Sequence, residues 1–417
     1  MIKPGSVLLL AVCASWLVTG CAHFSVAYEP VREWVDRDTG HRVVRLSVEP
    51  DSRSLYFHQN AFMPDGRMVF TTTNGIFAVR LDTRQIEKLV PAPAHIVMVG
   101  KKFGRVYYTL DHSFMSLDPA TGKTRKLFEL PPHWGIGTIN CDETLAAGTI
   151  TETDEAEKDL KKMASREDEI KFMKGKGLMM EERLAKKLPM ELFFLDLQTG
   201  EVRRNLKVTD WLGHLQFSPT DPQQLMFCHE GIWQDVTRTW LIRADGTGLT
   251  NIHNRTMQME IAGHEFWGVD GKTAWYDLQT PRSQVFWLAG YNLQTGARTW
   301  YNLQRDEWSV HYNVSPDGRL FAGDGGGEGN VAHAKNGKWI YLFRPELIPN
   351  RMDPQVPGLI ATGVLHAEKL VNLKRHNYLL EPNVRFTPDG KWIVFRSDLQ
   401  GAPHIYAVEV KRADVPR

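Results

Sequence analysis

Residues 261–271 read Ile-Ala-Gly-His-Glu-Phe-Trp-Gly-Val-Asp-Gly, and this stretch decides the fold class because its layout recurs along the chain. A polar side chain, His264, stands five residues before the turn position Val269, and Asp-Gly completes the turn. The same offset from a turn residue recurs at Gln59, His214, His311 and Asn383. A polar residue at the same offset before successive turns predicts that these side chains point toward one common site.

Around these positions the chain repeats one unit. Each unit has an apolar entry, a turn of the Pro-Asp-Gly kind, a β-rich run and a second hairpin of the Asp-x-x-Thr-Gly kind. The first kind of turn occurs seven times, at residues 64–66, 100–101, 141–143, 219–221, 269–271, 316–318 and 388–390. Asp-Gly and Thr-Gly supply the positive-φ residues that tight hairpins need. The runs between turns are rich in β-branched and aromatic residues and predict strands.

Seven four-stranded units with short edges predict an all-β fold, a seven-bladed β-propeller, with a pair of β-sandwiches as the alternative. Residues 152–187 are rich in Asp, Glu, Lys and Met and predict one or two surface helices inserted in a blade. A second long spacing, residues 344–380, is Pro-rich at first and predicts a loop or short helix near His366 and Lys369. We expect one catalytic propeller domain over residues 34–417.

Residues 1–20 predict an export signal. Lys3 precedes an apolar run, residues 7–18, that is too short to span a membrane, and the run leads into Leu-Val-Thr-Gly-Cys ending at Cys21. This pattern resembles a bacterial lipoprotein signal, in which the cysteine becomes lipid-modified; an ordinary secretory leader is the alternative. Residues 21–33 then read as a polar tether. We expect an exported protein, either periplasmic or a lipoprotein that meets the membrane only through a lipid anchor at Cys21.

The composition narrows the classes of partner. The net charge of +1 argues against nucleic acid, for which a basic face would be expected. The thirteen Trp and eleven Tyr suit β-sheet cores or a surface that stacks on sugar rings. Four cysteines are too few for a disulfide framework. The sequence contains no phosphate-binding loop, dinucleotide fingerprint, His-Glu-x-x-His zinc motif or Gly-x-Ser-x-Gly elbow.

The histidine register is the strongest chemical signal. The innermost strands of a propeller line its central channel, and their equivalent positions face one another. His214, His264 and His311 come from three successive units and are therefore expected to converge near one mouth, joined by Gln59 and Asn383. A single histidine could simply line a polar, water-filled channel. Three histidines at equivalent positions favour an active site.

An arginine stands beside this ring. Residues 227–231 read Phe-Cys-His-Glu-Gly, and Arg238 follows them. A guanidinium group can pair bidentately with a substrate carboxylate. The alternative is an ion pair between Arg238 and an aspartate within the blade.

The order His214, Phe-Cys-His-Glu-Gly, Arg238, Gly-His-Glu-Phe-Trp and His311 resembles the oligogalacturonate lyases, over about residues 35–410. These are seven-bladed propeller enzymes of pectin degradation that use manganese or a similar divalent ion. The resemblance implies that His264 is the catalytic base. It implies that Arg238 binds substrate and stabilises charge, and that His311 is a metal ligand. Substrate binding is expected of three residues in or beside the ring: His214, His229 and Gln59.

The chain departs from the family's pattern at the remaining ligands. Where the family has a stretch shaped like Gln-x-x-His-Pro-His-Pro, this chain has Tyr378 at the glutamine position and Glu381 and Asn383 at the histidine positions. An oxygen-rich set with one imidazole can hold Mn²⁺, Mg²⁺ or Ca²⁺. His376 lies close enough in sequence to serve as a further ligand. The metal set expected is therefore His311, Glu381, Asn383 and His376, with Mn²⁺ as the first candidate.

These residues together predict a polysaccharide lyase. It would cleave short uronic-acid oligosaccharides, oligogalacturonate by resemblance, through metal-assisted β-elimination to 4,5-unsaturated products. Two alternatives stay open from the sequence. One is a lyase for a different uronide. The other is a non-catalytic, surface-tethered propeller that binds a glycan or a protein, which the substitutions at Glu381 and Asn383 favour.

Overall fold

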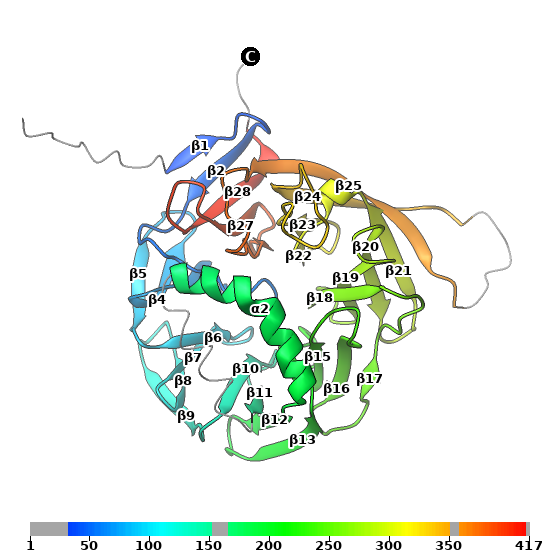
Figure 1. Cartoon of the computed structure of the whole chain (residues 1–417). Coiled ribbons are helices and arrows are strands. Elements are labelled where there is room, and N and C mark those ends of the chain that lie inside the picture. Colours follow the sequence, from blue (N-terminus) through cyan, green and yellow to red (C-terminus); the bar gives the residue numbers. More distant parts are fainter. Residues whose placement is uncertain (1–31, 152–165, 351–357, 414–417) are drawn as a thin grey trace, which may run out of the picture. The chain divides into compact units, whose positions relative to one another are not determined.

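A computed structural model describes residues 32–151, 166–350 and 358–413, which form a ring of β-sheets crossed by one long helix (Figure 1). The predicted leader, residues 1–20, lies outside the described residues, as does almost all of the predicted tether, residues 21–33, and both stay predictions. Among the described helices, none combines the length and the apolar character needed to cross a membrane.

The described strands make seven blades, so the predicted β-propeller is confirmed. They form six hydrogen-bonded sheets, and one of these, with eight strands, is two four-stranded blades joined edge to edge through the parallel pair β21 and β25. Five sheets and two halves give the seven blades. Four blades follow one another along the chain after the first turn. The first two contain β3 (Arg67–Thr72), β4 (Gly75–Arg80) and β5 (Ile86–Pro91), and then β6 (His95–Val99), β7 (Val106–Leu110), β8 (Ser113–Leu117) and β9 (Thr124–Glu129). The next two contain β10 (Trp134–Ile139), β11 (Leu145–Thr151), β12 (Met190–Asp196) and β13 (Val202–Val208), and then β14 (Trp211–Phe217), β15 (Gln224–Glu230), β16 (Thr239–Arg243) and β17 (Thr250–Asn251). The eight-stranded sheet contains β18 (Ile261–Trp267), β19 (Thr273–Gln279), β20 (Phe286–Asn292), β21 (Arg298–Leu303), β22 (Tyr312–Val314), β23 (Phe321–Gly323), β24 (Trp339–Leu347) and β25 (Ala361–Asn372).

The seventh blade joins the two ends of the described chain. Its sheet runs in the order β1 (Glu33–Val35), β2 (His41–Arg45), β28 (His404–Arg412), β27 (Trp392–Ser397) and β26 (Arg385–Phe386). The antiparallel pair β2 and β28 closes the ring by joining strands from the two ends of the described chain. A propeller leaves each blade only short, protected edges. Apolar side chains from the first and last blades also share one core cluster, which includes Val69, Val394 and Ala407.

The turn chemistry read from the sequence is confirmed. The glycines that end the Asp-Gly turns, Gly66, Gly271, Gly318 and Gly390, have φ values of 84°, 63°, 72° and 70°. At Gly271 a Cβ atom would also lie only 2.0 Å from Thr220 Oγ1 of the neighbouring blade. Glycine is therefore required there both by backbone conformation and by the close approach of two blades.

Several details differ from the predicted units of four strands. The sheet β3–β5 has three strands and the closing sheet has five. The helical insertion is confirmed as α2 (Arg166–Lys186), between β11 and β12, while residues 152–165 lie outside the described residues. A 3-10 turn, η1 (Arg305–Glu307), precedes β22.

The prediction of a loop or short helix near His366 and Lys369 is wrong. Both residues lie on β25, which is antiparallel to β24 over most of its length and parallel to β21 at its start. Pairing on both edges stabilises an extended conformation that the Pro-rich composition of residues 344–380 does not reveal.

A buried carboxyl group, Asp277 on β19, connects neighbouring blades. Its Oδ1 accepts a hydrogen bond from Trp308 Nε1 (2.9 Å), and its Oδ2 accepts one from Gln279 Nε2 (3.3 Å). Burial raises the pKa of Asp277 to about 7, against the opposing effect of these hydrogen bonds.

Asp277 is expected to make the fold less stable as the pH rises from 4 to 8. Between its ordinary pKa of 3.8 and about 7, the folded state keeps a proton that the unfolded state has released, so stability falls with pH. The loss is at most about 4 kcal/mol. Urea denaturation at several pH values should show that Asp277→Asn flattens this slope. Equal slopes for the wild type and the variant would contradict the assignment.

Candidate active site

Three of the five positions that share the offset in the sequence also share a backbone feature. His214 on β14, His264 on β18 and Asn383 before β26 have left-handed backbones, with φ values of 49°, 46° and 55°. On β14 and β18 this conformation coincides with β-bulges, between Gly213 and Gln216 and between Gly263 and Phe266. A bulge re-aims the side chains of a strand, and strained residues of this kind cluster at functional sites.

His264 and His311 face each other, as the sequence predicts. Their ring centroids are 4.8 Å apart at an interplanar angle of 74°, although the residues come from different blades. Both side chains are buried. The ring centroids of Trp233 and His264 are 5.0 Å apart at an interplanar angle of 82°, so Trp233 shields His264 on another side. The two imidazoles therefore belong to one site and not to separate regions of the core.

His264 has the properties of a base. Its Nδ1 is buried without a hydrogen-bond partner among the described residues. Burial first, and then the positive charges of His311, Arg238 and His214, hold the pKa of His264 well below its usual value. The imidazole is therefore neutral near pH 7 and keeps a lone pair that can accept a proton.

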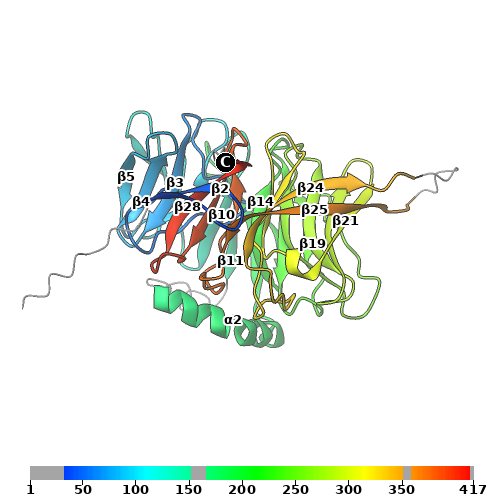
Figure 2. The same cartoon turned by 90° about the horizontal axis from the view of Figure 1, so that it is seen from above.

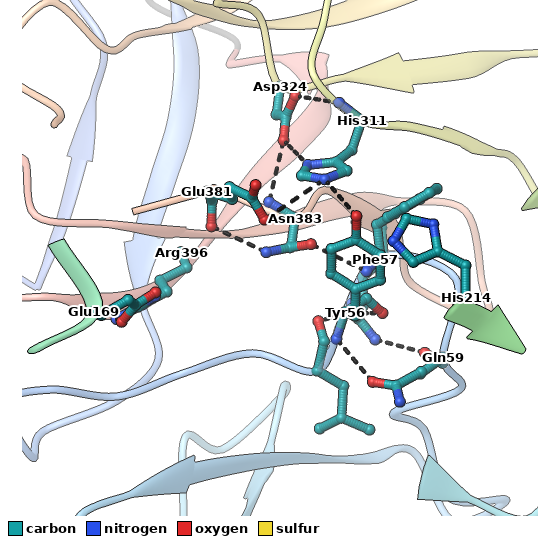
Figure 3. A network of polar contacts seen from close by, with 12 residues as sticks. Tyr56, Phe57, Gln59, Glu169, His214, His311, Asp324, Glu381, Asn383 and Arg396 are labelled. Carbon is teal, nitrogen blue, oxygen red and sulfur yellow. Dashed lines mark hydrogen bonds and ion pairs between the residues drawn. The ribbon is translucent and has the colours of Figure 1, made fainter. Parts of the chain in front are cut away.

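His311 is held in one orientation by Asp324. Its Nδ1 lies 2.8 Å from Asp324 Oδ2, and its backbone N–H donates to Asp324 Oδ1 at 2.8 Å (Figure 3). The other ring nitrogen, Nε2, faces the Tyr56 hydroxyl at 3.2 Å and Glu381 Oε2 at 3.7 Å. A carboxylate behind the ring and oxygen atoms in front of it are typical of a metal-ligating histidine.

Asn383 lies beside this pair, but its side chain is engaged. Its Oδ1 accepts a hydrogen bond from the backbone N–H of Phe57 (3.1 Å), and its Nδ2 donates to the Glu381 carbonyl (3.1 Å). Its backbone N–H donates to Asp324 Oδ2 (3.2 Å). Asn383 thus positions Phe57, whose ring centroid lies 4.7 Å from that of His311.

The predicted metal set is assembled only in part. His311 and Glu381 are suitable ligands for a divalent cation, because His311 Nε2 and Glu381 Oε2 lie 3.7 Å apart. The Asn383 oxygen already accepts a hydrogen bond, and His376 lies instead against Asp398, with Nδ1 to Oδ1 at 3.0 Å. Within the described residues, His311, Glu381 and His376 do not form a group whose ligand atoms lie within 4.8 Å of one another.

Arg238 is buried in a cluster of four charged side chains. Its Nη1 donates to Glu230 Oε2 (3.0 Å) and its Nε to Glu265 Oε2 (3.2 Å). His214 lies between the same two carboxylates, with Nε2 3.0 Å from Glu230 Oε1 and Nδ1 3.1 Å from Glu265 Oε1. The partners that Arg238 finds within the fold are therefore glutamates, not an aspartate.

The four charges balance. Burial works against ionisation of both glutamates, yet the charges of Arg238 and His214 hold the pKa of Glu265 at about 2 and that of Glu230 well below its usual range. Burial likewise opposes protonation of His214, but the neighbouring Cys228 and Glu230 raise the pKa of His214 well above its usual value. Burial raises the pKa of the neighbouring Cys228 thiol to about 12, so at pH 7 the carboxylates, and not a thiolate, stabilise the imidazolium.

The same cluster holds the one group of three potential metal ligands in the described part of the chain, His214, Cys228 and Glu230. The Arg238 guanidinium contacts Glu230 and also lies 3.1 Å from His214 Nδ1. A resident cation would compete with that guanidinium for the same carboxylate. We therefore interpret this group as part of the charged cluster.

The remaining predicted residues lie around this centre. Gln59 contacts the site indirectly, because its Oε1 accepts a hydrogen bond from the backbone N–H of Tyr56 (3.0 Å). His229 pairs with Asp210 at 2.7 Å and stacks on Trp240. The roles expected of Gln59 and His229 in substrate binding stay predictions.

The sequence reading missed the residue that joins the two halves of the site. The Tyr56 ring lies 5.1 Å from both the His214 ring and the His311 ring, so it bridges the charged cluster and the His311 pair (Figure 3). Trp233, Glu265 and Asp324 were also missed as site residues. Glu265 stands directly after His264, and that adjacency was the signal in the sequence that could have found it.

Two surface cavities lie away from this site. Two cavities, of about 410 Å³ and 650 Å³, are lined by charged residues of the first and last blades and of β24 and β25. Neither is lined by His264, His311 or Arg238. The chemistry of the side chains, and not the size of a cavity, identifies the centre of the ring as the candidate active site.

Comparisons with known proteins agree with this geometry. A sequence model of one family, described as oligogalacturonate lyase, matches residues 22–414. The chain is 27% identical over 402 residues to the oligogalacturonate lyase of Dickeya dadantii and 25% identical over 406 residues to the oligogalacturonide lyase of Pectobacterium atrosepticum. Both matches cover 90% of this chain and 95% of the relative.

Two solved structures share the fold. An oligogalacturonate lyase in complex with manganese has a TM-score of 0.71 at 23% identity, and an oligogalacturonate lyase from Vibrio parahaemolyticus has a TM-score of 0.70 at 22% identity. Each match covers 91% of this chain and 96% of the other. At this level of identity the likeness establishes the propeller arrangement alone.

Proposed function

The chain belongs to the oligogalacturonate lyase family, and on that premise we propose that it is a polysaccharide lyase that cleaves short uronic-acid oligosaccharides by β-elimination. The names of its relatives point to oligogalacturonate as the substrate class. One observation carries the proposal, the setting of the His264 imidazole. The ring is buried, its pKa is held well below the usual value, and its Nδ1 has no hydrogen-bond partner among the described residues. Its centroid lies 4.8 Å from that of the His311 ring.

The proposed step begins at the C5–H bond of a uronate, which is weakly acidic because it lies beside a carboxylate. His264 takes the proton. The electrons of the C5–H bond form the C4–C5 double bond, and the C4–O bond breaks with its electron pair on the leaving oxygen. That oxygen takes up a proton from water, and the hydroxide left behind removes the proton from His264, which regenerates the base without net consumption of water. The products are a shortened oligosaccharide and a 4,5-unsaturated uronide.

The charge that develops on the substrate carboxylate needs stabilisation. Arg238 and the His214 imidazolium lie beside His264, but Glu230 and Glu265 balance their charges, so this cluster shapes the site without adding net positive charge. A divalent ion, when bound by His311 and Glu381, would neutralise the carboxylate and acidify the C5 proton. Asp324 would orient His311 for that role.

An absorbance assay tests the proposal, because a 4,5-unsaturated uronide absorbs in the near ultraviolet. Purified protein with Mn²⁺ and digalacturonate or trigalacturonate is expected to show a steady rise in absorbance. Removal of metal with EDTA is expected to lower the rate, and added Mn²⁺, Mg²⁺ or Ca²⁺ to restore it to different extents. Heat-denatured protein is the control.

Other outcomes would select the alternatives. Turnover of a glucuronate-containing oligosaccharide in place of a galacturonate one would indicate a lyase for another uronide. If no uronide gives a signal with metal supplied, while calorimetry detects oligosaccharide binding, the protein is a non-catalytic binder and the proposed reaction is wrong.

A further inference from the structure

Helix α2 lies across the candidate site. The helix is the only long one among the described residues; Figure 2 shows it on one face of the ring, and Figure 1 shows it running past the middle of the ring from the side of β4 toward β15. A side chain on the inner face of α2 therefore faces the mouth of the ring.

The N-terminal half of α2 is fixed by ion pairs to the seventh blade. Arg166 Nη2 contacts Asp398 Oδ2 at 2.6 Å. Glu169 forms a two-pronged contact with the buried Arg396, at 2.7 Å and 2.9 Å, and Figure 3 shows this pair on the Glu381 side of the site. Paired, largely buried contacts of this kind define which face of the helix points inward.

The C-terminal half is fixed by packing. Met180 is the buried residue of the helix. The Arg183 guanidinium lies over the Trp211 ring, 4.6 Å from its centroid, at the start of β14. The two halves therefore rest on different blades, with the mouth of the ring between them.

Helix geometry places Lys176 on the same inner face. It stands seven residues after Glu169 and seven before Arg183, and residues seven apart lie nearly above one another on an α-helix. Its burial agrees, since Lys176 is half-buried while Lys171 and Lys174 are exposed. Its charge also reaches the site. Burial and nearer charges lower the pKa of His264, and Lys176 adds to them; burial raises the pKa of Glu230, and Lys176 opposes it together with nearer charges.

Lys176 has no hydrogen bond or ion pair in the described part of the chain. The other cations near the centre are engaged. Arg238 donates to Glu230 and Glu265, and Arg385 donates to the backbone carbonyls of residues 55, 56 and 59. An oligouronide carries one carboxylate on every sugar, so a second carboxylate needs a cation that the fold has not already neutralised.

We propose that Lys176 binds the carboxylate of a uronate adjacent to the one from which His264 removes a proton. This assignment rests on the proposed function and adds a second binding subsite to it, formed by the inner face of α2. An ammonium group on a flexible stem suits a carboxylate whose position varies between oligomers.

The sequence on either side supports a turn that adjusts to a ligand. Gly175 and Gly177 flank Lys176, and a Cβ atom at either position would meet nothing within 4 Å. Nothing in the packing requires these glycines, although glycine within a helix costs stability relative to alanine. They weaken the helix at Lys176 and not at its anchored ends.

Calorimetry on the full chain tests the proposal. Binding of digalacturonate and trigalacturonate would be measured in the His264→Gln background, which prevents turnover, with and without Lys176→Gln. Lys174→Gln, an exposed lysine two residues away on the same helix, is the matched control. Lys176→Gln is expected to weaken binding about tenfold and Lys174→Gln less than twofold. A thermal melt of each variant confirms folding.

A substrate change sharpens the test. When the carboxylate of the neighbouring sugar is methyl-esterified, the chain with Lys176 and the Lys176→Gln variant are expected to bind it equally. Equal binding of the acidic oligomers by Lys176→Gln and Lys174→Gln would overturn the Lys176 assignment and leave the lyase proposal intact. Binding that depends on Lys176, without turnover by the wild-type chain, would overturn the lyase proposal alone. An absence of all uronide binding would overturn both.

Discussion

Replacing His264 by glutamine is expected to lower kcat for oligogalacturonate cleavage by about 10²–10⁴-fold, the range over which general bases contribute. Glutamine keeps a polar side chain of similar reach but cannot accept a proton near pH 7. The position tolerates a polar residue because Nδ1 of His264 has no hydrogen-bond partner to lose within the described residues. The absorbance assay with saturating substrate and metal measures the effect.

The control for this substitution is His366→Gln. His366 is an exposed histidine on β25 that pairs with Glu346 at 2.7 Å, in contrast to the buried histidines of the site. Its replacement is expected to leave kcat within about twofold of the wild type. If His264→Gln is folded by its thermal melt and retains half of the wild-type kcat, His264 is not the base.

Replacing Arg238 by methionine is expected to destabilise the fold by about 3–5 kcal/mol and to abolish activity. The substitution leaves Glu230 and Glu265 buried against a single imidazolium, that of His214, so one carboxylate loses its counter-charge. Methionine fills much of the arginine volume, which separates the loss of charge from the loss of packing. Urea denaturation measures the change in the free energy of unfolding.

A surface ion pair supplies the matched control for Arg238. Arg203 pairs with Glu201 at 3.2 Å, but both side chains are more than half exposed. Arg203→Met is expected to change stability by less than about 1 kcal/mol, because solvent screens exposed pairs. Equal, small changes for Arg203→Met and Arg238→Met would show that the cluster around Arg238 is not a set of interdependent charges.

The sequence was informative wherever a local pattern fixes the backbone. The Asp-Gly turns required positive φ, and the glycines at positions 66, 271, 318 and 390 have it. His214, His264 and Asn383 each stand five residues before a turn position. All three have a left-handed backbone, on the inner edges of three blades. The charged, Met-rich segment predicted the helix that became α2. All of these depend on neighbours close in sequence.

The partners of the site side chains were harder to predict. Arg238 was expected to bind substrate, with an ion pair to an aspartate of the blade as the alternative, and the structure pairs it with Glu230 and Glu265. His376 was expected to join the metal set, and its ring lies against Asp398 instead. Tyr56 gave no sign in the sequence that it lies between His214 and His311.

The sequence by itself determined the repeat, the turns, the helical insertion and the register that brings His214, His264 and His311 to one centre. Only the tertiary structure decided how the ring closes, through β2 and β28, and what each central side chain contacts, as when Phe57 donates to Asn383 from 326 residues away. The physical reason is that backbone conformation follows from adjacent residues. The charge balance and hydrogen bonds of a buried site instead depend on groups that only closure of the ring brings together.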